Sequence, residues 1–484
     1  MDGAAQCPME LWAIIPELIV AGLGLILVPV AGFAHGRLRY VPAWAAMVGL
    51  VLAMGLTARM LAWEPLTVFC GTYAVDGFGT VFKLILEAGA LVSLLILLGY
   101  LKGHPLIAHA PLAVLFSTLG GMGLAASLDL GLIVLFVQML SLASYLLVGL
   151  VRDQPLANEA TFKYFIYAAA ALAIMAYGLT FLYGLTGSLN LNRIGAGLHP
   201  DKVGIWIAVA LGLILIGYAF EMTVVPFHFW APDVYQGATA PVSGFLSVVP
   251  KVAGFAGLLR LFLSLFPGGL PGWPIGMAVL AAATMILGNL AALRQKRLKR
   301  LLAYSSIAQA GYILMAVAVA ARGNGALDAI GFYLAAYLFM NLGAFAAAAQ
   351  LERTLGSDSL TALQGLGRLS PWLAAVLCLC LLSLAGIPPL AGFAGKILLL
   401  TAAMQGGLTW LAVVAVVNMT VALYYYVAVA AQLYMRPPPP GAVAVPGDPV
   451  SQLSLGLCLA GTILFGVFPG WLLALTRFLP RLIH

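Results

Sequence analysis

Apolar runs of about 20 residues recur from one end of the chain to the other, and each is long enough to cross a bilayer as an α-helix. Of the 484 residues, 63% are hydrophobic and only 8% are charged. Soluble proteins carry roughly 25% charged residues, so a soluble globule is excluded. The sequence therefore predicts an all-α polytopic membrane protein.

Gly, Pro and charged residues punctuate the apolar runs and divide them into about 14 expected transmembrane helices. These spans cover residues 11–33, 41–62, 79–100, 111–129, 131–151, 161–186, 203–225, 240–266, 274–293, 301–320, 326–350, 372–404, 406–434 and 450–475. The longest polar connection, RPPPPGAVAVPGDPVSQ (436–452), is proline-rich and predicts a stiff loop. We therefore expect a single membrane domain over residues 1–484.

Two groups of five spans are expected to form repeats inside this domain. The first repeat covers 111–266 and the second covers 274–434. Residues 1–110 hold three N-terminal helices, and 450–475 form a C-terminal helix. If spans four to eight match spans nine to thirteen, the two repeats are inverted and the seventh span corresponds to the twelfth.

The seventh and twelfth spans carry helix-breaking residues. Pro226 follows Glu221 at the end of the seventh span, and GIPP (386–389) lies in the middle of the twelfth. Proline removes a backbone donor and clashes with the preceding turn, so both helices should be broken, and paired breaks are typical of a transport site. A competing match of PVSGF (241–245) with PLAGF (389–393) would pair the eighth span with the twelfth instead.

Most basic residues lie in short loops, where they set the orientation of the chain, so the net charge of +7 does not indicate nucleic-acid binding. The densest cluster, RQKRLKR (294–300), should face the cytoplasm. Other basic loops on the same side hold Arg37 and Arg39, Lys102, Arg152, Arg353 and Arg436. Both termini then lie on the outer side of the cell membrane, although Arg477 and Arg481 count against this orientation.

Charged residues inside the spans are candidate proton-handling groups, because a charge at mid-bilayer costs roughly 2.5–3.5 kcal/mol on insertion scales. Lys251 lies within the eighth span, and Lys396 follows the break in the twelfth. Glu221 lies beside the break in the seventh span. Lysines linked by water and polar side chains would form a proton relay across the membrane midplane. The polar side chains considered for this relay are Ser305, Ser306 and Gln309, with Gln138 and Ser141 as polar points in the fifth span.

Two further pairs of charges have an alternative structural explanation. Lys83 and Glu87 are four residues apart, and so are Glu159 and Lys163. Residues at this spacing share one face of a helix, so each pair can neutralise itself. The second pair also lies close to a cytoplasmic loop and could be interfacial.

Three polar or aromatic residues follow the break in the seventh span, namely His228, Trp230 and Asp233. They are candidates for proton transfer, but they can also close the broken helix end by hydrogen bonding. The second role is the expected one.

The five cysteines match no zinc or haem spacing and are expected to be small apolar fillers. They are Cys7, Cys70, Cys378, Cys380 and Cys458. No metal-ligand cluster, nucleotide-binding glycine loop or nucleophile elbow is found in the sequence.

Several long motifs resemble the antiporter-like membrane subunits of respiratory complex I. They are PFHFWAPDVYQGATAPVSGFLSVVPKVAGF (226–255), GNLAALRQKRLKRLLAYSSIAQAGY (288–312), NLGAF (341–345) and SLAGIPPLAGFAGK (383–396). The segments PELIV (16–20), EATFKYF (159–165) and YYY (424–426) are most similar to subunit N of that family. The resemblance covers nearly the whole chain.

This resemblance implies a fourteen-helix fold with two inverted five-helix repeats. The family's lysine of the eighth span falls on Lys251, and that of the twelfth falls on Lys396. The chain departs from the family at two positions, because the glutamate expected in the fifth span is Gln138 and the lysine expected in the seventh is Glu221. We hypothesise that the acid has moved to another helix and that Glu221 interacts with Lys251.

The resemblance also implies proton translocation coupled to electron transfer from NADH to quinone. The chain lacks the cysteine sets that iron–sulfur clusters need, so NADH, FMN, these clusters and quinone are expected in partner subunits. The expected partners are the other membrane and peripheral subunits of the complex. Three alternatives stay open: a subunit of a multi-subunit cation/proton antiporter, a subunit of a membrane-bound hydrogenase complex, and a non-conducting scaffold, which Gln138 would permit.

Overall fold

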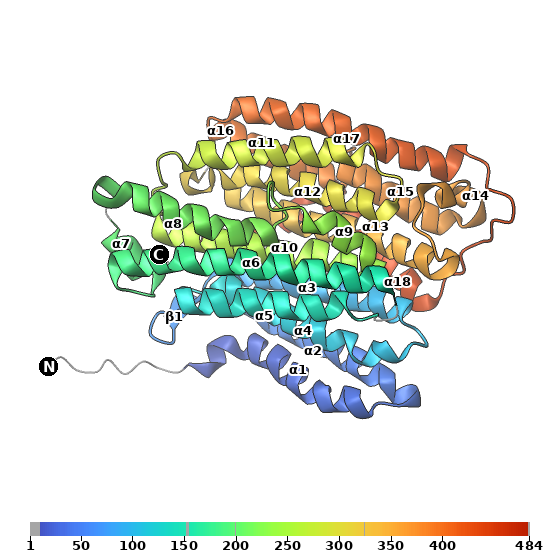
Figure 1. The fold of residues 1–484 in the computed structure, drawn as a ribbon, viewed down its shortest axis with the longest axis horizontal. Helices are drawn as coiled ribbons and strands as arrows, with labels where there is room; N and C mark the ends of the chain where they lie inside the picture. Colours follow the sequence, from blue (N-terminus) through green and yellow to red (C-terminus); the bar gives the residue numbers. More distant parts are fainter. Residues whose placement is uncertain (1–9, 152–153, 199, 324, 483–484) are drawn as a thin grey trace.

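The chain forms an almost wholly helical bundle in a computed structural model that describes residues 10–151, 154–198, 200–323 and 325–482. Its helices run roughly parallel to one another along the long axis of the view in Figure 1. This arrangement confirms the predicted all-α polytopic fold. Cys7 and Arg152, which entered the sequence analysis, lie outside the described residues.

The N-terminal part consists of α1 (Ile15–Phe33), α2 (Val41–Met60) and α3 (Gly77–Tyr100). The first set of five spans is α4 (Ala110–Ala126), α5 (Leu130–Val148), α6 (Pro155–Thr186), α8 (Pro200–Glu221) with α9 (Trp230–Gly237), and α10 (Ala240–Leu265). The second set is α11 (Trp273–Ala292), α12 (Leu298–Val317), α13 (Ala326–Leu355), α15 (Pro371–Ala385) with α16 (Ala391–Gln405), and α17 (Thr409–Met435). The chain continues into α18 (Pro449–Val467) and α19 (Pro469–Thr476).

Short elements connect these helices. The further α-helices are α7 (Leu191–Gly197) and α14 (Leu366–Leu369). The 3₁₀ helices are η1 (Leu11–Ile14), η2 (Gly36–Tyr40), η3 (Pro105–Ala108), η4 (Ala320–Arg322) and η5 (Leu360–Leu363). One antiparallel hairpin joins α2 to α3, with β1 (Leu66–Val68) paired to β2 (Tyr73–Val75) so that Leu66 lies opposite Val75.

Within the described residues, 13 helical segments are long and apolar enough to cross a membrane. The helices α15 and α16 are each too short, but together they make one more interrupted crossing. The total of fourteen agrees with the sequence analysis. Each five-span set has its broken member in fourth place, α8–α9 in the first and α15–α16 in the second.

Both breaks fall where the sequence predicts them. The seventh span stops at Glu221, and the indole Nε1 of Trp230 donates a hydrogen bond of 3.2 Å to the carbonyl of Phe220, which closes the open end. The twelfth span stops before Gly386, whose φ of +95° is a left-handed conformation that favours glycine. A Cβ atom there would also lie 3.0 Å from Cδ of Lys396, so this turn needs a glycine for two reasons.

The centre of the bundle is formed by helices that are buried on all sides. The most apolar window of α10 is 100% buried, and those of α12 and α13 are 94% buried, whereas that of α1 is only 33% buried. These three helices lie in the middle of Figure 1, and α1 and α17 lie at opposite edges. Any charged side chain on α10 is therefore enclosed by protein.

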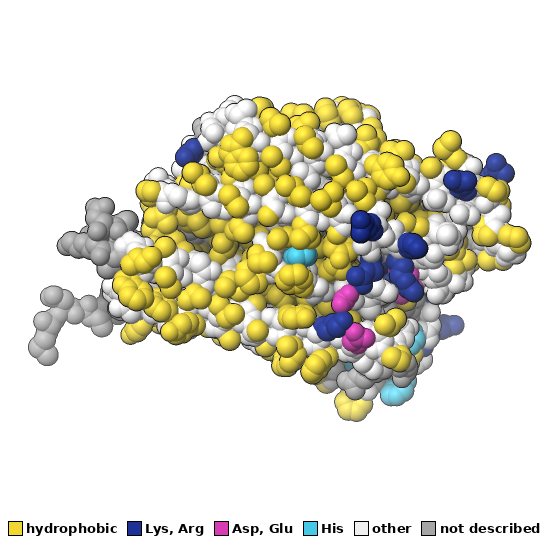
Figure 2. All heavy atoms as spheres, turned by 45° about the horizontal axis from the view of Figure 1, so that its top comes forward, with side chains coloured by type: hydrophobic (Ala, Val, Ile, Leu, Met, Phe, Trp, Pro, Cys, Tyr) yellow, Lys and Arg dark blue, Asp and Glu magenta, His cyan; other side chains and the backbone are white. Residues whose placement is uncertain are grey.

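The basic loops gather at one end of the bundle, as the sequence predicts. Nη1 of Arg39 donates to the carbonyl of Gly103 (2.9 Å), and Nζ of Lys299 contacts Oε2 of Glu352 (2.9 Å). Most of the charged side chains visible in Figure 2 lie toward this end of an otherwise apolar face. The β-hairpin, α7 and α19 lie at the opposite end, where Gly77 packs against the backbone of Phe478.

Candidate functional site

Lys251 lies on α10 at the centre of the bundle and has no exposed surface. Its Nζ donates hydrogen bonds to the backbone oxygen (2.6 Å) and to Oγ (2.5 Å) of Ser306 on α12. The hydroxyl of Tyr337 on α13 donates to the same Oγ at 2.9 Å. The ammonium is thus held by neutral oxygens, so a change in its charge alters the hydrogen bonding of two neighbouring helices.

Lys396 lies on α16 and is held by the broken end of α15. Its Nζ donates to the carbonyls of Leu384 (2.7 Å) and Ala385 (3.0 Å). The last carbonyls of a helix have no partner within it and carry partial negative charge, so they suit an ammonium. The ring of Tyr312 lies 4.9 Å from the same Nζ, a cation–π distance. The break in the twelfth span therefore supplies the cation's ligands.

The helix α12 brings the surroundings of the two lysines together. Ser306 and Gln309 are three residues apart and so share one face of the helix. Nε2 of Gln309 donates to the carbonyl of Leu384 at 3.1 Å, the same oxygen that accepts from Lys396. We call the series Lys251, Ser306, Gln309, Leu384 carbonyl and Lys396 the polar chain. Among the described residues, every step of it is a direct hydrogen bond except the step from Ser306 to Gln309.

Tyrosines surround the polar chain. The hydroxyl of Tyr333 donates to Oε1 of Gln309, and Nε2 of Gln309 donates to the hydroxyl of Tyr426 at 3.3 Å. Tyr426 also shares a short hydrogen bond with Ser305. Asn289 extends the polar region, because its Nδ2 donates to the hydroxyl of Tyr312 at 3.2 Å. The apolar core therefore contains a strip of polar groups able to order water.

Glu221 is a buried carboxylate at the end of α8, where this helix packs against α10. Its Oε1 accepts a hydrogen bond from Oγ of Ser141 on α5 (2.5 Å), while Oε2 has no partner in the described part of the chain. A Cβ atom on Gly254 would lie 3.1 Å from Cβ of Glu221, so the two helices meet one turn beyond Lys251. No ion pair joins Glu221 to Lys251 among the described residues, and Gln138 lies half-buried one turn before Ser141.

The residues after the break in α8 have separate roles. Trp230 stacks on Tyr164 of α6 with ring centroids 4.5 Å apart, and this packing adds to its closure of the helix end. His228 is buried, and its Nδ1 has no hydrogen-bond partner in the part of the chain that is described. Asp233 points elsewhere, to Lys163 and Arg300. The expected hydrogen-bonded closure is therefore made by Trp230.

Asp233 belongs to a half-exposed cluster at the end with the basic loops. Its two oxygens contact Nζ of Lys163 (2.8 Å) and Nη1 of Arg300 (2.8 Å), and Lys163 also pairs with Glu159 at 2.8 Å. A cavity of about 190 Å³ lies among these side chains. Asp233 lies outside the candidate spans. Partial burial acts to raise the pKa of its carboxyl, but hydrogen bonds from the two cations outweigh this and lower the pKa below its ordinary value.

Comparison with known proteins places this arrangement in a family. A family described as "NADH:quinone oxidoreductase/Mrp antiporter, TM" matches residues 127–422. NADH-quinone oxidoreductase subunit N 1 of Solibacter usitatus is 38% identical over 475 residues, which cover 96% of each chain. Subunit N of Geobacillus kaustophilus is 39% identical over 94% of each chain.

The chain belongs to the subunit N family of NADH-quinone oxidoreductase. A chain of respiratory complex I from Thermus thermophilus with bound aureothin has a similar fold, with a TM-score of 0.81 and 35% sequence identity. The match covers 95% of this chain and 98% of that one. The resemblance drawn from the sequence motifs is thus confirmed for the family and the fold.

The pairing of Lys83 with Glu87, one of the two explanations considered for these charges, is not found in the structure of this subunit N. Nζ of Lys83 pairs with Oε1 of Glu17 on α1 (2.6 Å), whereas Oε1 of Glu87 accepts from Thr57 on α2 (2.9 Å). Lys83 and Glu87 lie on one face of α3, but each takes its partner from a different helix. The hydroxyl of Tyr73 also donates to Glu17 at 2.6 Å, which fixes the carboxylate beside the lysine.

Two further ion pairs, one buried and one partly buried, were not predicted from the sequence. Arg260 on α10 makes a two-pronged contact with Asp76 before α3, at 2.5 and 2.7 Å. Lys299 pairs with Glu352 at 2.9 Å. Glu17, the partner of Lys83, was also passed over. In each case the available signal was the same, a charged residue in or beside an apolar run.

The cysteines also need a correction. Cys70, in the hairpin before α3, is disulfide-bonded, so it is not merely a small apolar filler. Cys378, Cys380 and Cys458 are free, and the last two are buried, as expected for packing residues.

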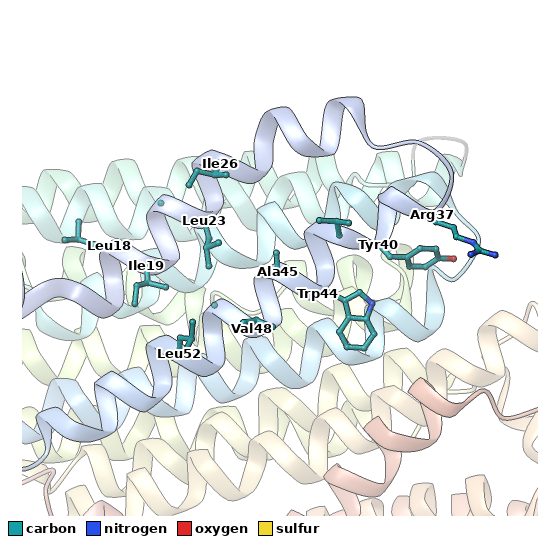
Figure 3. Close-up of a pocket in the computed structure, with 13 residues that line it drawn as sticks. Leu18, Ile19, Leu23, Ile26, Arg37, Tyr40, Trp44, Ala45, Val48 and Leu52 are labelled. Atoms are coloured by element: carbon teal, nitrogen blue, oxygen red, sulfur yellow. The ribbon is translucent and has the colours of Figure 1, made fainter.

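A large apolar groove lies apart from all of these ionisable groups. It has a volume of about 890 Å³ and runs between α1 and α2, lined by side chains such as Leu18, Ile26 and Trp44. Figure 3 shows Arg37 and Tyr40 at one end of it. Its lining is exposed and mostly apolar, and the groove is separate from the buried lysines Lys251 and Lys396.

Proposed function

We propose that this chain is the proton-translocating membrane subunit of a respiratory NADH:quinone oxidoreductase. Family membership supports the assembly, with NADH, FMN, iron–sulfur clusters and quinone held by partner subunits. The observation that carries the proton-handling role is the pair of buried lysines, Lys251 and Lys396. The helix α12 links them, because it carries Ser306, which binds Lys251, and Gln309, which shares a carbonyl with Lys396. Burial of two ammonium groups in a membrane bundle is expensive and marks a functional path.

The polar chain supports a two-site relay. A proton arriving at Lys251 completes an ammonium that Ser306 can ligate, and its departure leaves a neutral amine with a lone pair ready for the next proton. Water ordered beside Ser306 and Gln309 would carry the proton across the one gap in the direct contacts. At Lys396 the proton is held by the Leu384 and Ala385 carbonyls until it leaves.

Glu221 is proposed to pass protons to Lys251 from the side of α5 and α8. Its free Oε2 and its position against α10 support this role, and water would bridge the remaining distance. Gln138 has no proton to exchange, so Glu221 replaces the carboxylate that the fifth span lacks. On this basis Glu221→Gln should lower the number of protons pumped per NADH about as much as Lys251→Ala.

We further propose that the chain lies in the cell membrane with the basic loops in the cytoplasm and both termini outside. The gathering of these loops at one end supports the orientation. The disulfide of Cys70 supports it independently, because disulfides persist on the oxidising side of a membrane and Cys70 lies at the opposite end.

The test uses the intact complex in sealed vesicles. NADH-driven proton uptake per electron is measured for the wild type, for Lys251→Ala, for Lys396→Ala and for the double variant, after native electrophoresis and mass spectrometry confirm assembly with flavin and iron–sulfur subunits. Each single variant should lower the proton yield. An unchanged yield in the double variant would show a non-conducting scaffold and overturn the proposal.

A further inference from the structure

A second group of buried ionisable side chains lies outside both five-span sets. Glu17 of α1 and Lys83 of α3 form an ion pair of 2.6 Å, and Glu87 lies one turn further along α3. The exposed fractions of the three residues are 7%, 1% and 0%. The polar partners that surround them, Thr57 on α2 and the hydroxyl of Tyr73 on β2, are neutral.

The charges of this group do not balance if every residue is ionised. Two carboxylates face one ammonium, so the fully ionised cluster carries an uncompensated negative charge inside the bundle, which is strongly unfavourable. The next charged groups along α3 offer no help, because Asp76 and Arg260 neutralise each other in a two-pronged contact. One of the two glutamates must therefore hold a proton.

We propose that Glu17, Lys83 and Glu87 form an additional proton-binding site, in which one proton is shared by the two carboxyl groups and Lys83 pairs with whichever of them is ionised. The inference rests on the proposed function in so far as protons are what the subunit transports. Its geometric basis is separate, because each carboxyl has an oxygen, Glu17 Oε2 and Glu87 Oε2, with no partner in the described part of the chain.

The exchange conserves one proton and all charges. In the structure Glu17 contacts Lys83 and Glu87 accepts from Thr57, and the proposal assigns the charge to Glu17 and the proton to Glu87 in this arrangement. In the alternative arrangement the proton has moved to Glu17, and Lys83 pairs with ionised Glu87 four residues away on its own helix. The lysine stays protonated throughout, and no other bond forms or breaks.

The fold places the two carboxyl groups at different depths in the bundle. Glu87 lies about four residues, or roughly 6 Å of helix rise, further from the start of α3 than Lys83. Glu17 lies in the first turn of α1 and is bonded to Tyr73 of the hairpin, at the end of the bundle opposite the basic loops. Transfer from Glu87 to Glu17 therefore moves a proton from the interior toward that surface.

Infrared spectroscopy of the purified complex tests the charge balance directly, because a protonated carboxyl absorbs separately from an ionised one. Glu17→Gln and Glu87→Gln should each lose one carboxylic acid band relative to the wild type, since one acid and one lysine then balance. Lys83→Met should gain one, since both acids become protonated. Glu352→Gln, which removes an ionised partner of Lys299, serves as the control and should lose none.

Proton transport gives the second readout. Glu87→Gln should lower the proton yield per electron in sealed vesicles, and Glu87→Asp should restore part of it. The proposal is overturned if the carboxylic acid band survives in both Glu17→Gln and Glu87→Gln, or if the band changes as expected but the proton yield stays at the wild-type value. A scaffold role revealed by the Lys251 and Lys396 variants would leave the infrared result intact, so the two proposals fail separately.

Discussion

Two ion pairs of this protein have the same chemistry but different burial, and they allow the effect of burial to be measured. Arg260 and Asp76 meet with side chains that are 1% and 0% exposed, whereas Arg353 and Asp448 meet at 3.4 Å with side chains that are 38% and 17% exposed. Both aspartates also cap a helix, α3 and α18 respectively. Replacing either with Asn keeps a good capping residue and a similar shape, while it removes the charge and one of the two acceptor oxygens.

Asp76→Asn leaves the Arg260 guanidinium buried without a counter-charge. Removing one partner of a buried pair typically costs about 3–5 kcal/mol. The matched change Asp448→Asn breaks an exposed pair, which is worth about 0–1 kcal/mol. Since about 1.4 kcal/mol corresponds to a factor of ten, the buried variant should raise the unfolded population of the subunit more than tenfold above the exposed one.

The assay heats the purified complex in mild detergent and follows the fraction that retains this subunit by native electrophoresis. Asp76→Asn should lower the midpoint temperature clearly, and Asp448→Asn should barely change it. The double variant Asp76→Asn/Arg260→Met should recover much of the loss, because it removes the stranded charge. Equal midpoint shifts for the two single aspartate variants would refute the reasoning that burial decides the energy of these pairs.

Three other perturbations probe the site. Gly386→Ala places a Cβ in a left-handed turn, at about 1–2 kcal/mol, and 3.0 Å from Cδ of Lys396, so it should reduce the proton yield in vesicles, whereas Gly470→Ala, in open space, should not. Trp230→Phe keeps the ring packing and removes one hydrogen bond to the end of α8, so it should lower the stability of the subunit by about 0.5–1.5 kcal/mol. An unchanged midpoint temperature of inactivation would contradict the capping role. Because the pKa of Asp233 is lowered in the folded protein, its ionised form stabilises the fold above the unfolded pKa, and this stability is lost as the pH falls through the folded pKa. Acid should therefore weaken the contact of α6 with α9. Asp233→Asn should remove this pH dependence of heat stability.

Features set by local sequence were predictable. Apolar length determines where a helix crosses a bilayer, and proline and glycine determine where it must break, so the crossings and the interruptions near Pro226 and Gly386 agree with the structure. Lys251 and Lys396 were identified because a charge in an apolar run is unusual wherever it occurs. The structure encloses both side chains, with Lys251 on a fully buried helix and Lys396 on the buried face of α16.

Features set by tertiary contact were not predictable. The pairing of Lys83 with Glu17 joins residues of different helices, and no spacing rule reaches that far. The spacing of four residues places Lys83 and Glu87 close together, but the carboxylate of Glu17 on another helix is the partner that Lys83 takes. The ligands of Lys396 were hidden for another reason, because they are backbone carbonyls, which every residue has.

The shared carbonyl of Leu384 has a mechanical consequence. It accepts hydrogen bonds from both Lys396 and Gln309, so it connects the broken end of α15 to α12 and to the ammonium group. In the proposed relay, loss of the proton from Lys396 would weaken its hydrogen bonds to this carbonyl and so loosen the end of α15. The charge on one nitrogen would then control the local rigidity of the helix break.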